Sequence, residues 1–464
     1  MTTRRDLLKA CGTGFGMTAF ARLAAGAGPV GGGISTNPLV PKAPHFPAKA
    51  KHVIFLFLNG GPSQVDTFDP KPMLDKYNGK PVPTGNLATE RKTGNLLKSP
   101  FEFKKHGQSG IEISEIFPKL GEQADELCVI RSMYTDRPNH EPSLLLMNTG
   151  DKFVGRPSMG SWLTYGLGSE NQNLPGYVVL CPGLPVIGPQ LWASTFLPAV
   201  YQGTYIPNNE KTTDKLVQYI KNPDLSLADQ RKQLDLLGKL NEMHLRRAGE
   251  DRELEAAVQS AEIAYRMQTE APEVFDISKE SVKTRERYGD TEFGRGCLMA
   301  LRLVEKGVRM VQVYHGNGQP WDSHDDIQSH KRLARAADPA IGSLLEDLKS
   351  RGVLDETLVI ISGEFGRTPA VEVSGLVKVQ NGRDHNSHGF STVLAGGGIK
   401  RGHIHGATDD FGFKAVEKPV HIHDLHATLL HLMGLDHTKL TYRYSGRDFR
   451  LTDVAGNVVH EILG

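Results

Sequence analysis

Val53-Ile-Phe-Leu-Phe-Leu58 is a continuous apolar run, and Asn59-Gly60-Gly61-Pro62 ends it. Continuous rather than alternating hydrophobicity is typical of a strand that is buried on both faces, as in a parallel sheet. Five further runs share this texture: Leu127–Ile130, Tyr177–Leu180, Val308–Val313, Thr357–Ile361 and Thr392–Ala395. The runs therefore predict the strands of one sheet with helices on both of its faces.

Helical patterns lie between several of these runs. One extends from Glu292 to Lys306, and another from Pro339 to Arg351. In the second, Asp338 stands where an N-cap is expected and the proline takes the first helical position. Strands that alternate with helices predict an α/β fold, with a doubly wound, mostly parallel sheet flanked by helices.

The middle of the chain has a different texture. From about residue 214 to residue 287 it is charged, with leucine and alanine at helical spacing and almost no strand signal. No heptad persists for three or four repeats, which disfavours a coiled coil. We expect a helical insertion within one α/β domain that spans residues 48–464.

The N-terminus resembles an export signal. Arg4 and Arg5 precede a weakly apolar stretch of small residues, and Ala25-Gly26-Ala27 fits a cleavage site. Residues 1–27 are therefore predicted to be a twin-arginine signal, and residues 28–47 a flexible lead. Export would place the protein in the periplasm or at the cell surface. The alternative is a frayed basic arm.

Composition excludes several functional classes. The 464 residues include 54 Lys and Arg against 53 Asp and Glu, a net charge of +1, so no global field attracts nucleic acid. No apolar run approaches the roughly twenty residues that a membrane span needs. Cys128, Cys181 and Cys297 are too widely spaced to predict a disulfide framework or a cysteine zinc site. Without a cysteine cluster or haem-attachment pattern, a redox protein is disfavoured.

Polar residues gather where the predicted strands end. In open α/β sheets, ligands bind beyond the carboxyl ends of the strands. The polar residues that follow or precede the runs are Asn59, Ser63, Asp66, His140, His315, Asp322, His324, Ser362, Glu364, Arg367, Arg383 and His385. We expect these segments to converge on one edge of the sheet.

Asp322 and His324 form an Asp-x-His pair, and His385 follows later in the chain. Carboxylate oxygen and imidazole nitrogen suit zinc, manganese or iron better than calcium. Taken alone, the pair is more typical of a capping turn, and the convergence of segments favours a metal site. The His-x-His pairs at His403 and His421 are interpreted as half-buried polar positions.

Several motifs resemble one bacterial family. They are Asn59-Gly-Gly-Pro-Ser-Gln-Val-Asp-Thr-Phe-Asp-Pro-Lys71, Trp321-Asp-Ser-His324, Gly363-Glu-Phe-Gly-Arg-Thr-Pro369, Gly382-Arg-Asp-His385 and Ser445-Gly-Arg-Asp-Phe-Arg-Leu-Thr-Asp453. With the export signal, they resemble the family catalogued as domain of unknown function 1501, over essentially the whole mature chain. That family is similar to the alkaline phosphatase and sulfatase superfamily, which implies a large α/β sheet with a metal site at its carboxyl edge.

The resemblance implies a ligand set. Asp322, His324 and His385 take the places of first-site ligands, and Glu364 and Asn59 would complete or flank that site. Phe365 stands where a second site would need histidine, and Asn59 where the superfamily has a metal-binding aspartate. The resemblance therefore implies one divalent metal ion rather than two.

The segment His140-Glu-Pro-Ser-Leu resembles the sulfatase segment Cys-x-Pro-Ser-Arg. His140 replaces the modified cysteine and Leu144 replaces the arginine, so formylglycine chemistry is excluded where this alignment holds. Three roles remain open for His140: a nucleophile, an acid or base, or a metal ligand.

These inferences predict an exported, metal-dependent hydrolase of phosphate or sulfate esters. Its substrate would be an anionic ester, on a polysaccharide or a small molecule. Arg367 or Arg383 would clamp a substrate oxygen, or both would serve as structural ion-pair partners. The rival hypothesis is a non-catalytic, sulfatase-like module for binding or assembly at the cell surface.

Overall fold

The apolar runs all form strands of one sheet in the computed structural model, which describes residues 38–217, 224–249 and 252–464. Within those residues the sheet has nine strands. In spatial order they are β13 (His403–His405), β5 (Leu127–Tyr134), β12 (Phe390–Ala395), β9 (Thr357–Ser362), β1 (His52–Phe57), β8 (Met310–Tyr314), β6 (Tyr177–Leu180) and β7 (Thr204–Ile206), and β16 (Val420–His421) pairs with β5.

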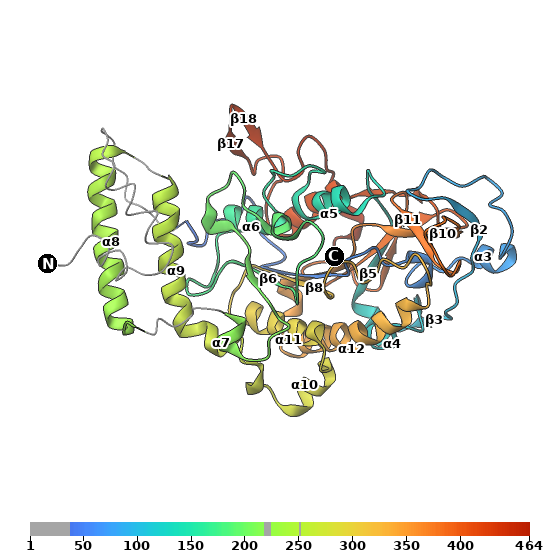
Figure 1. Ribbon diagram of the computed structural model, residues 1–464, viewed down its shortest axis with the longest axis horizontal. Coiled ribbons are helices and arrows are strands. Elements are labelled where there is room, and N and C mark those ends of the chain that lie inside the picture. The colour runs from blue at the N-terminus through green and yellow to red at the C-terminus, as the bar shows by residue number, and fades with distance from the viewer. Residues whose placement is uncertain (1–37, 218–223, 250–251) are drawn as a thin grey trace.

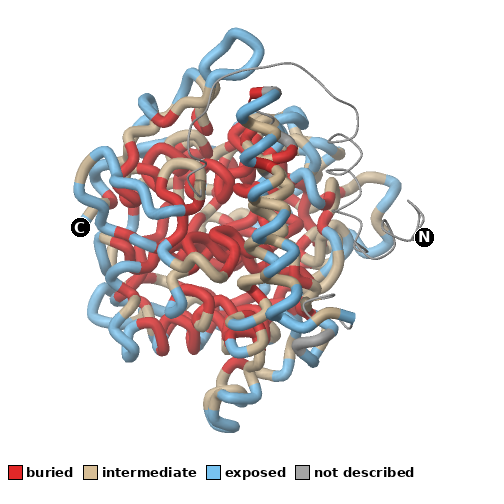
Figure 2. Tube along the Cα trace, turned by 90° about the vertical axis from the view of Figure 1, so that its left-hand side faces the viewer, coloured by how far each residue is buried: buried red, intermediate tan, exposed pale blue. Residues whose placement is uncertain are grey.

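Strand β1 shows why its apolar run is continuous. Successive side chains of a strand point to opposite faces, so Val53 and Phe55 enter one core while Ile54 and Leu56 enter the other. The face of Ile54 is covered by α4 (Pro118–Gly121), α11 (Glu292–Glu305) and α12 (Ser329–Ser350), and the opposite face by α5 (His140–Thr149), α6 (Met159–Leu167) and α13 (Ile422–Leu432). Figure 1 shows these two helical layers, and Figure 2 shows the buried interior between them. The predicted doubly wound fold class is confirmed.

The sheet is mostly parallel, as predicted, with one reversed strand. Strand β12 runs antiparallel to β5 and β9, with Val393 opposite Ile361, whereas the other pairs in the sheet are parallel. Consequently, β12 begins at the edge where β1, β8 and β9 end. Residues just before β12 thus reach the same edge as residues just after the parallel strands.

A small antiparallel sheet lies beyond that edge. It contains β11 (Arg383–Asn386), β10 (Gly366–Glu372) and β2 (Thr93–Leu96), in that order. Arg367 of β10 pairs with His385 of β11. Because β10 follows β9 after a short turn, the small sheet carries both residues to the carboxyl edge of the large one.

The helix that the sequence places at residues 339–351 begins earlier. Helix α12 starts at Ser329, and Pro339 lies inside it. Asp338 is therefore not an N-cap. Its buried carboxylate accepts hydrogen bonds of 2.8 Å from the backbone N–H groups of Lys119 and Leu120 on α4, and burial raises the pKa of Asp338 to about 6. The Asp-Pro signature thus marks a contact between helices rather than a helix start.

Residues 214–287, expected to form a helical insertion, are helical over much of their described length. Helix α8 (Leu227–Ala248) is the outermost element in Figure 1 and contacts α9 (Arg252–Val274). The remaining elements are α3 (Pro72–Tyr77), α7 (Thr213–Leu216), α10 (Val282–Tyr288), β3 (Phe103–His106), β4 (Ile111–Ser114), β14 (Ala407–Thr408), β15 (Ala415–Glu417), β17 (Tyr442–Tyr444) and β18 (Arg447–Phe449). In the described ranges, no helix has both the length and the hydrophobicity to cross a bilayer.

The predicted export signal, residues 1–27, lies outside the described residues, as does the first half of the predicted lead. The described part of that lead is not free. His45 and Phe46 donate backbone hydrogen bonds to the carbonyl of Gly434, just after α13, and Leu39 is buried. Within residues 38–47, backbone hydrogen bonds and a buried leucine connect this segment to the domain.

Candidate metal centre

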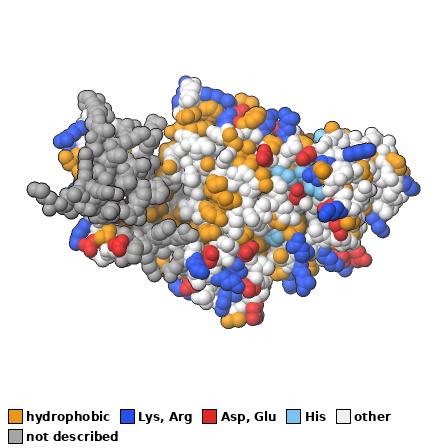
Figure 3. All heavy atoms as spheres, in the orientation of Figure 1, with side chains coloured by type: hydrophobic (Ala, Val, Ile, Leu, Met, Phe, Trp, Pro, Cys, Tyr) orange, Lys and Arg blue, Asp and Glu red, His pale blue; other side chains and the backbone are white. Residues whose placement is uncertain are grey.

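Four predicted or candidate site residues meet at the carboxyl edge of the sheet. Asp322 and His324 follow β8, His385 lies on β11, and His140 is the first residue of α5, after β5. Each offers one donor atom, and these four atoms lie within 4.8 Å of one another. In Figure 3, histidine and acidic side chains reach the surface side by side to the right of centre.

The three imidazole rings all direct their Nε2 atoms toward one oxygen. The Nε2 atoms of His324, His385 and His140 lie 2.8, 3.1 and 3.3 Å from the same oxygen, Oδ1 of Asp322. The Nε2 atoms of His140 and His324 are buried, and neither has a hydrogen-bond partner within the described chain. Three inward-facing nitrogens around one carboxylate oxygen form a set of donors that matches zinc, manganese or iron.

A glutamate holds the far side of each ring. Nδ1 of His140 lies 2.7 Å from Glu364, Nδ1 of His385 lies 2.6 Å from Glu90, and Nδ1 of His324 contacts Glu372. Since a carboxylate accepts, each Nδ1 carries the proton, and the Nε2 lone pair is left for a cation. This carboxylate–histidine arrangement orients the histidine ligands of metal sites.

Glu364 and Asn59, expected to complete or flank the metal site, each hold a segment that supports the four-residue cluster. Glu364 is fully buried and also accepts from the backbone N–H of Gly60 at 3.0 Å. Gly60 has a φ of +113°, and a Cβ there would lie 2.6 Å from the backbone nitrogen of Asp322, so only glycine permits this approach. The amide nitrogen of Asn59 binds the carbonyl of Gly318, which holds the loop after β8.

Arg367 contacts the cluster from beneath. Its guanidinium is buried and lies 2.5 Å from Oδ1 of Asp322, while its other donors bind the carbonyls of Gly60 and Gly61. Burial alone would raise the pKa of Asp322, but the charge of Arg367 is the largest opposing cause, and the net effect holds that pKa well below its usual range. Arg367 therefore keeps Asp322 ionised, which matches the structural ion-pair role that was one of its two predicted alternatives.

Arg383, predicted as either a substrate clamp or a structural ion-pair partner, pairs with a buried aspartate. Its Nε and Nη2 atoms lie 2.7 and 3.1 Å from the two oxygens of Asp66, and both side chains are fully buried. The remaining donors bind the carbonyls of Thr368 and Leu97. The guanidinium is thus committed to a buried ion pair, which was the structural alternative left open for it.

Phe365 packs against two rings of the cluster. Its ring centroid lies 4.8 Å from that of His140 and 4.6 Å from that of His385. A further group of potential donors contains His324, Glu372 and Asp384. Arg91 already binds both carboxylates of this group, through its guanidinium and its backbone N–H.

The sequence did not single out Glu90 or Glu372. Glu372 stands between Val371 and Val373, an alternation that in a strand turns the glutamate to the face opposite the valines, so its burial could not be predicted from the sequence. Glu90 lies in a loop of charged residues without strand or helix, and its distance in sequence from His385 hides the contact. Its pKa is lowered chiefly by its hydrogen bond to His385.

The orienting role of Glu364 predicts a measurable effect. Replacing Glu364 with glutamine keeps its shape but removes the charge that polarises His140, so the affinity for Zn²⁺ is expected to fall about 10- to 100-fold. Competition with a fluorescent chelator measures this affinity. Glu417→Gln, at an exposed position on β15, is the matched control and should leave affinity unchanged. Equal affinities for Glu364→Gln and the control would contradict an orienting role.

Comparisons with known proteins give one family match and several similar solved structures. The family described as "Protein of unknown function (DUF1501)" matches residues 50–463. Among solved structures, the chain is similar to a protein in the alkaline phosphatase superfamily from Vibrio parahaemolyticus, at 12% identity and a TM-score of 0.35, over 86% of this chain and 70% of that chain. It is also similar to a sulfatase from Pseudoalteromonas sp., at 14% identity and a TM-score of 0.34, over 83% and 68%.

A third similar structure is a phosphonate monoester hydrolase from Silicibacter pomeroyi, at 13% identity and a TM-score of 0.28, over 68% of each chain. No curated protein matches the sequence of this chain.

Proposed function

Since this chain belongs to the family described as proteins of unknown function, DUF1501, its site must identify its chemistry, and we propose that it is a metal-dependent hydrolase of phosphate or sulfate esters. The main support for this proposal is that three Nε2 atoms converge on Oδ1 of Asp322, and that a glutamate holds each of the three rings. His140, Asp322, His324 and His385 would hold one divalent ion, with zinc, manganese or iron as the candidates.

The charge around the cluster supports a bound cation. Five carboxylates surround it, against two guanidinium groups: Glu90, Asp322, Glu364, Glu372 and Asp384 against Arg91 and Arg367. Charges held in a protein interior require compensation. A divalent cation would neutralise most of this excess, and the same excess would repel an anionic ester until the cation is bound.

A bound divalent ion would polarise an ester oxygen and neutralise the charge that develops on it. The residues of the chain would then have distinct tasks. Arg367 keeps Asp322 ionised, Glu364 keeps the proton of His140 on Nδ1, and Glu90 does the same for His385. Because the Nε2 atom of His140 faces the other donors, His140 would act as a ligand rather than as a nucleophile.

Export remains part of the proposal. Arg4, Arg5 and the small residues up to Ala27 support a twin-arginine route, which carries folded proteins. A site assembled from segments so far apart in sequence exists only after folding. Metal loading before export to the periplasm or cell surface would fit both observations.

One observation favours the rival function, a binding or assembly module. Four protein donors would fill a tetrahedral shell, which is typical of structural zinc sites, whereas catalytic sites keep a position open. The rival also keeps a metal, so metal content alone does not separate the two functions.

Turnover separates them. The protein, loaded in turn with Zn²⁺, Mn²⁺ and Fe²⁺, is expected to hydrolyse 4-nitrophenyl phosphate or 4-nitrophenyl sulfate, and chelation is expected to abolish that activity. Release of 4-nitrophenol measures it. Stoichiometric metal without turnover of either ester would support the module and count against the hydrolase.

A further inference from the structure

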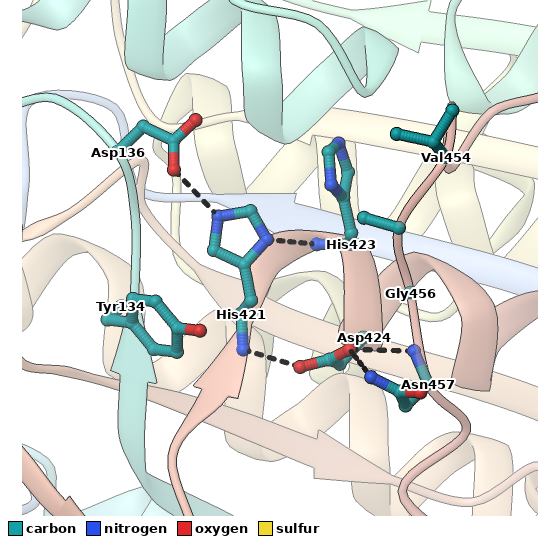
Figure 4. A pocket seen from close by; sticks show the side chains of 9 residues that line it. Tyr134, Asp136, His421, His423, Asp424, Val454, Gly456 and Asn457 are labelled. Atoms are coloured by element: carbon teal, nitrogen blue, oxygen red, sulfur yellow. Dashed lines mark hydrogen bonds and ion pairs between the residues drawn. The ribbon is translucent and has the colours of Figure 1, made fainter.

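A pocket of about 540 Å³ opens beside the metal centre. Its lining includes Tyr134 at the end of β5, His421 at the end of β16, and His423 and Asp424 in the first turn of α13. Strand β16 runs parallel to β5, with His421 opposite Tyr134, so both strands deliver these side chains to one edge of the sheet. Figure 4 shows His421 and His423 side by side in this pocket, with Asp136 above and Asn457 below.

The pocket and the metal centre are neighbours along the same edge. Asp136 lines the pocket, and His140 follows four residues later, which limits the distance between their α-carbons to about 14 Å. The backbone N–H of Thr135, the residue before Asp136, donates to the carbonyl of Ser387 at 2.9 Å, two residues beyond His385. A molecule the size of a few sugar rings would span this separation.

The polar atoms of the pocket offer mainly hydrogen-bond acceptors. Oδ1 of Asp136 already accepts from Nε2 of His421 at 3.1 Å, but no hydrogen bond within the described chain engages Oδ2. Nε2 of His423 donates to the carbonyl of Gly150, so its Nδ1 is an acceptor. Among the described residues no arginine or lysine lines the pocket, and Lys152 forms a long ion pair of 3.9 Å with Asp136. This lining suits hydroxyl donors and disfavours an anionic group.

One exposed apolar side chain belongs to the pocket, since Val454 lines it and is 81% exposed. Ligand pockets combine apolar surface with a few placed polar groups. A sugar ring has the complementary chemistry, because its hydroxyl groups donate from the edge while its C–H groups form apolar faces.

We propose that this pocket binds a neutral sugar residue, and that the ester hydrolysed at the metal centre is carried by an adjoining part of the same carbohydrate. The second clause rests on the proposed function, whereas the first does not. The anionic ester would lie at the cation and the hydroxylated ring in the acceptor-rich pocket, which divides recognition between two sites of different charge.

The test measures sugar binding without any ester or metal. Neutral disaccharides built from hexose, 6-deoxyhexose and N-acetylhexosamine are titrated into metal-free protein by calorimetry, and the tightest is soaked into crystals. Val454→Trp narrows the mouth of the pocket at a highly exposed position, so it should not disturb folding. The affinity of the Val454→Trp variant for the tightest disaccharide is expected to fall roughly tenfold or more, about the effect of losing one or two hydrogen bonds.

Val282→Trp is the matched control, since Val282 is 61% exposed on α10, which packs against α11 and α12 on the other face of the sheet from α13. It should bind as the wild type does. Failure of every disaccharide to bind, or binding that Val454→Trp leaves unchanged, would overturn the proposal. Preferential binding of a protonated amine, probed with ethanolamine, would overturn it in favour of a cation site. Because the titration needs no hydrolysis, its result stands even if no ester is turned over.

Discussion

The Asp322→Ala, His385→Ala double variant is expected to lose its divalent metal and its ester hydrolysis together. Zinc sites with four protein ligands bind with about 12 kcal/mol, which is about 3 kcal/mol for each ligand. Removing two ligands should therefore weaken metal binding by about 10⁴-fold. Elemental analysis of the purified protein and the 4-nitrophenyl ester assay measure the two losses.

Loss of Asp322 also removes the partner of the buried Arg367, so part of any effect would come from misfolding. The Asp322→Asn, His385→Gln variant keeps the volume of both side chains and should lose metal with less cost in stability. Asp355→Ala with His403→Ala, an aspartate and a histidine outside the cluster, is the matched control. Full metal content in a folded double variant would show that these four residues do not form the site.

Arg383→Met is expected to lower the free energy of unfolding by about 3–5 kcal/mol, because it leaves the Asp66 carboxylate without its counter-charge in the interior. Both partners are fully buried, and Ser63 contacts the same carboxylate. Urea unfolding followed by circular dichroism measures the change. His385 lies two residues further along β11, so metal affinity should fall as well.

A double-mutant cycle isolates this ion pair. Adding Asp66→Asn to Arg383→Met should recover part of the stability, since the uncompensated carboxylate is gone. Arg443→Ala, which breaks the exposed pair with Asp448 on the β17–β18 hairpin, should change stability by no more than about 1 kcal/mol. If Arg383→Met lowers the free energy of unfolding no more than this control does, the buried ion pair does not stabilise the fold.

Local hydrophobicity predicted the strands well, and it predicted much less about their surroundings. The run at residues 53–58 became β1, at the centre of the sheet, because such a run is stable only where both faces are covered. Hydrophobicity does not indicate whether a strand runs parallel or antiparallel to its neighbours. The reversal of β12 follows from the small sheet inserted before it, whose length no apolar pattern encodes.

The residues of the candidate site also fall into two groups, those that the sequence predicted and those that only the contacts reveal. Asp322, His324 and His385 were predicted because metal-ligand residue types follow or precede strands, and these three do converge. Glu90 and Arg383 act through partners far away in the sequence, so their tasks became visible only from contacts. Arg383 resembled a substrate clamp because a guanidinium suits an anion equally well whether that anion is a substrate or Asp66.

The four donors come from three widely separated stretches of chain, so an ion held among them would act as a cross-link. Closing such long loops removes conformational freedom from the unfolded chain, as a disulfide does. An ion present at a hundred times its dissociation constant would add about 2.7 kcal/mol to stability. The cysteines among the described residues are all free, so no disulfide performs this task there. The cation would cross-link three segments: helix α5, strand β11 and the segment that follows β8.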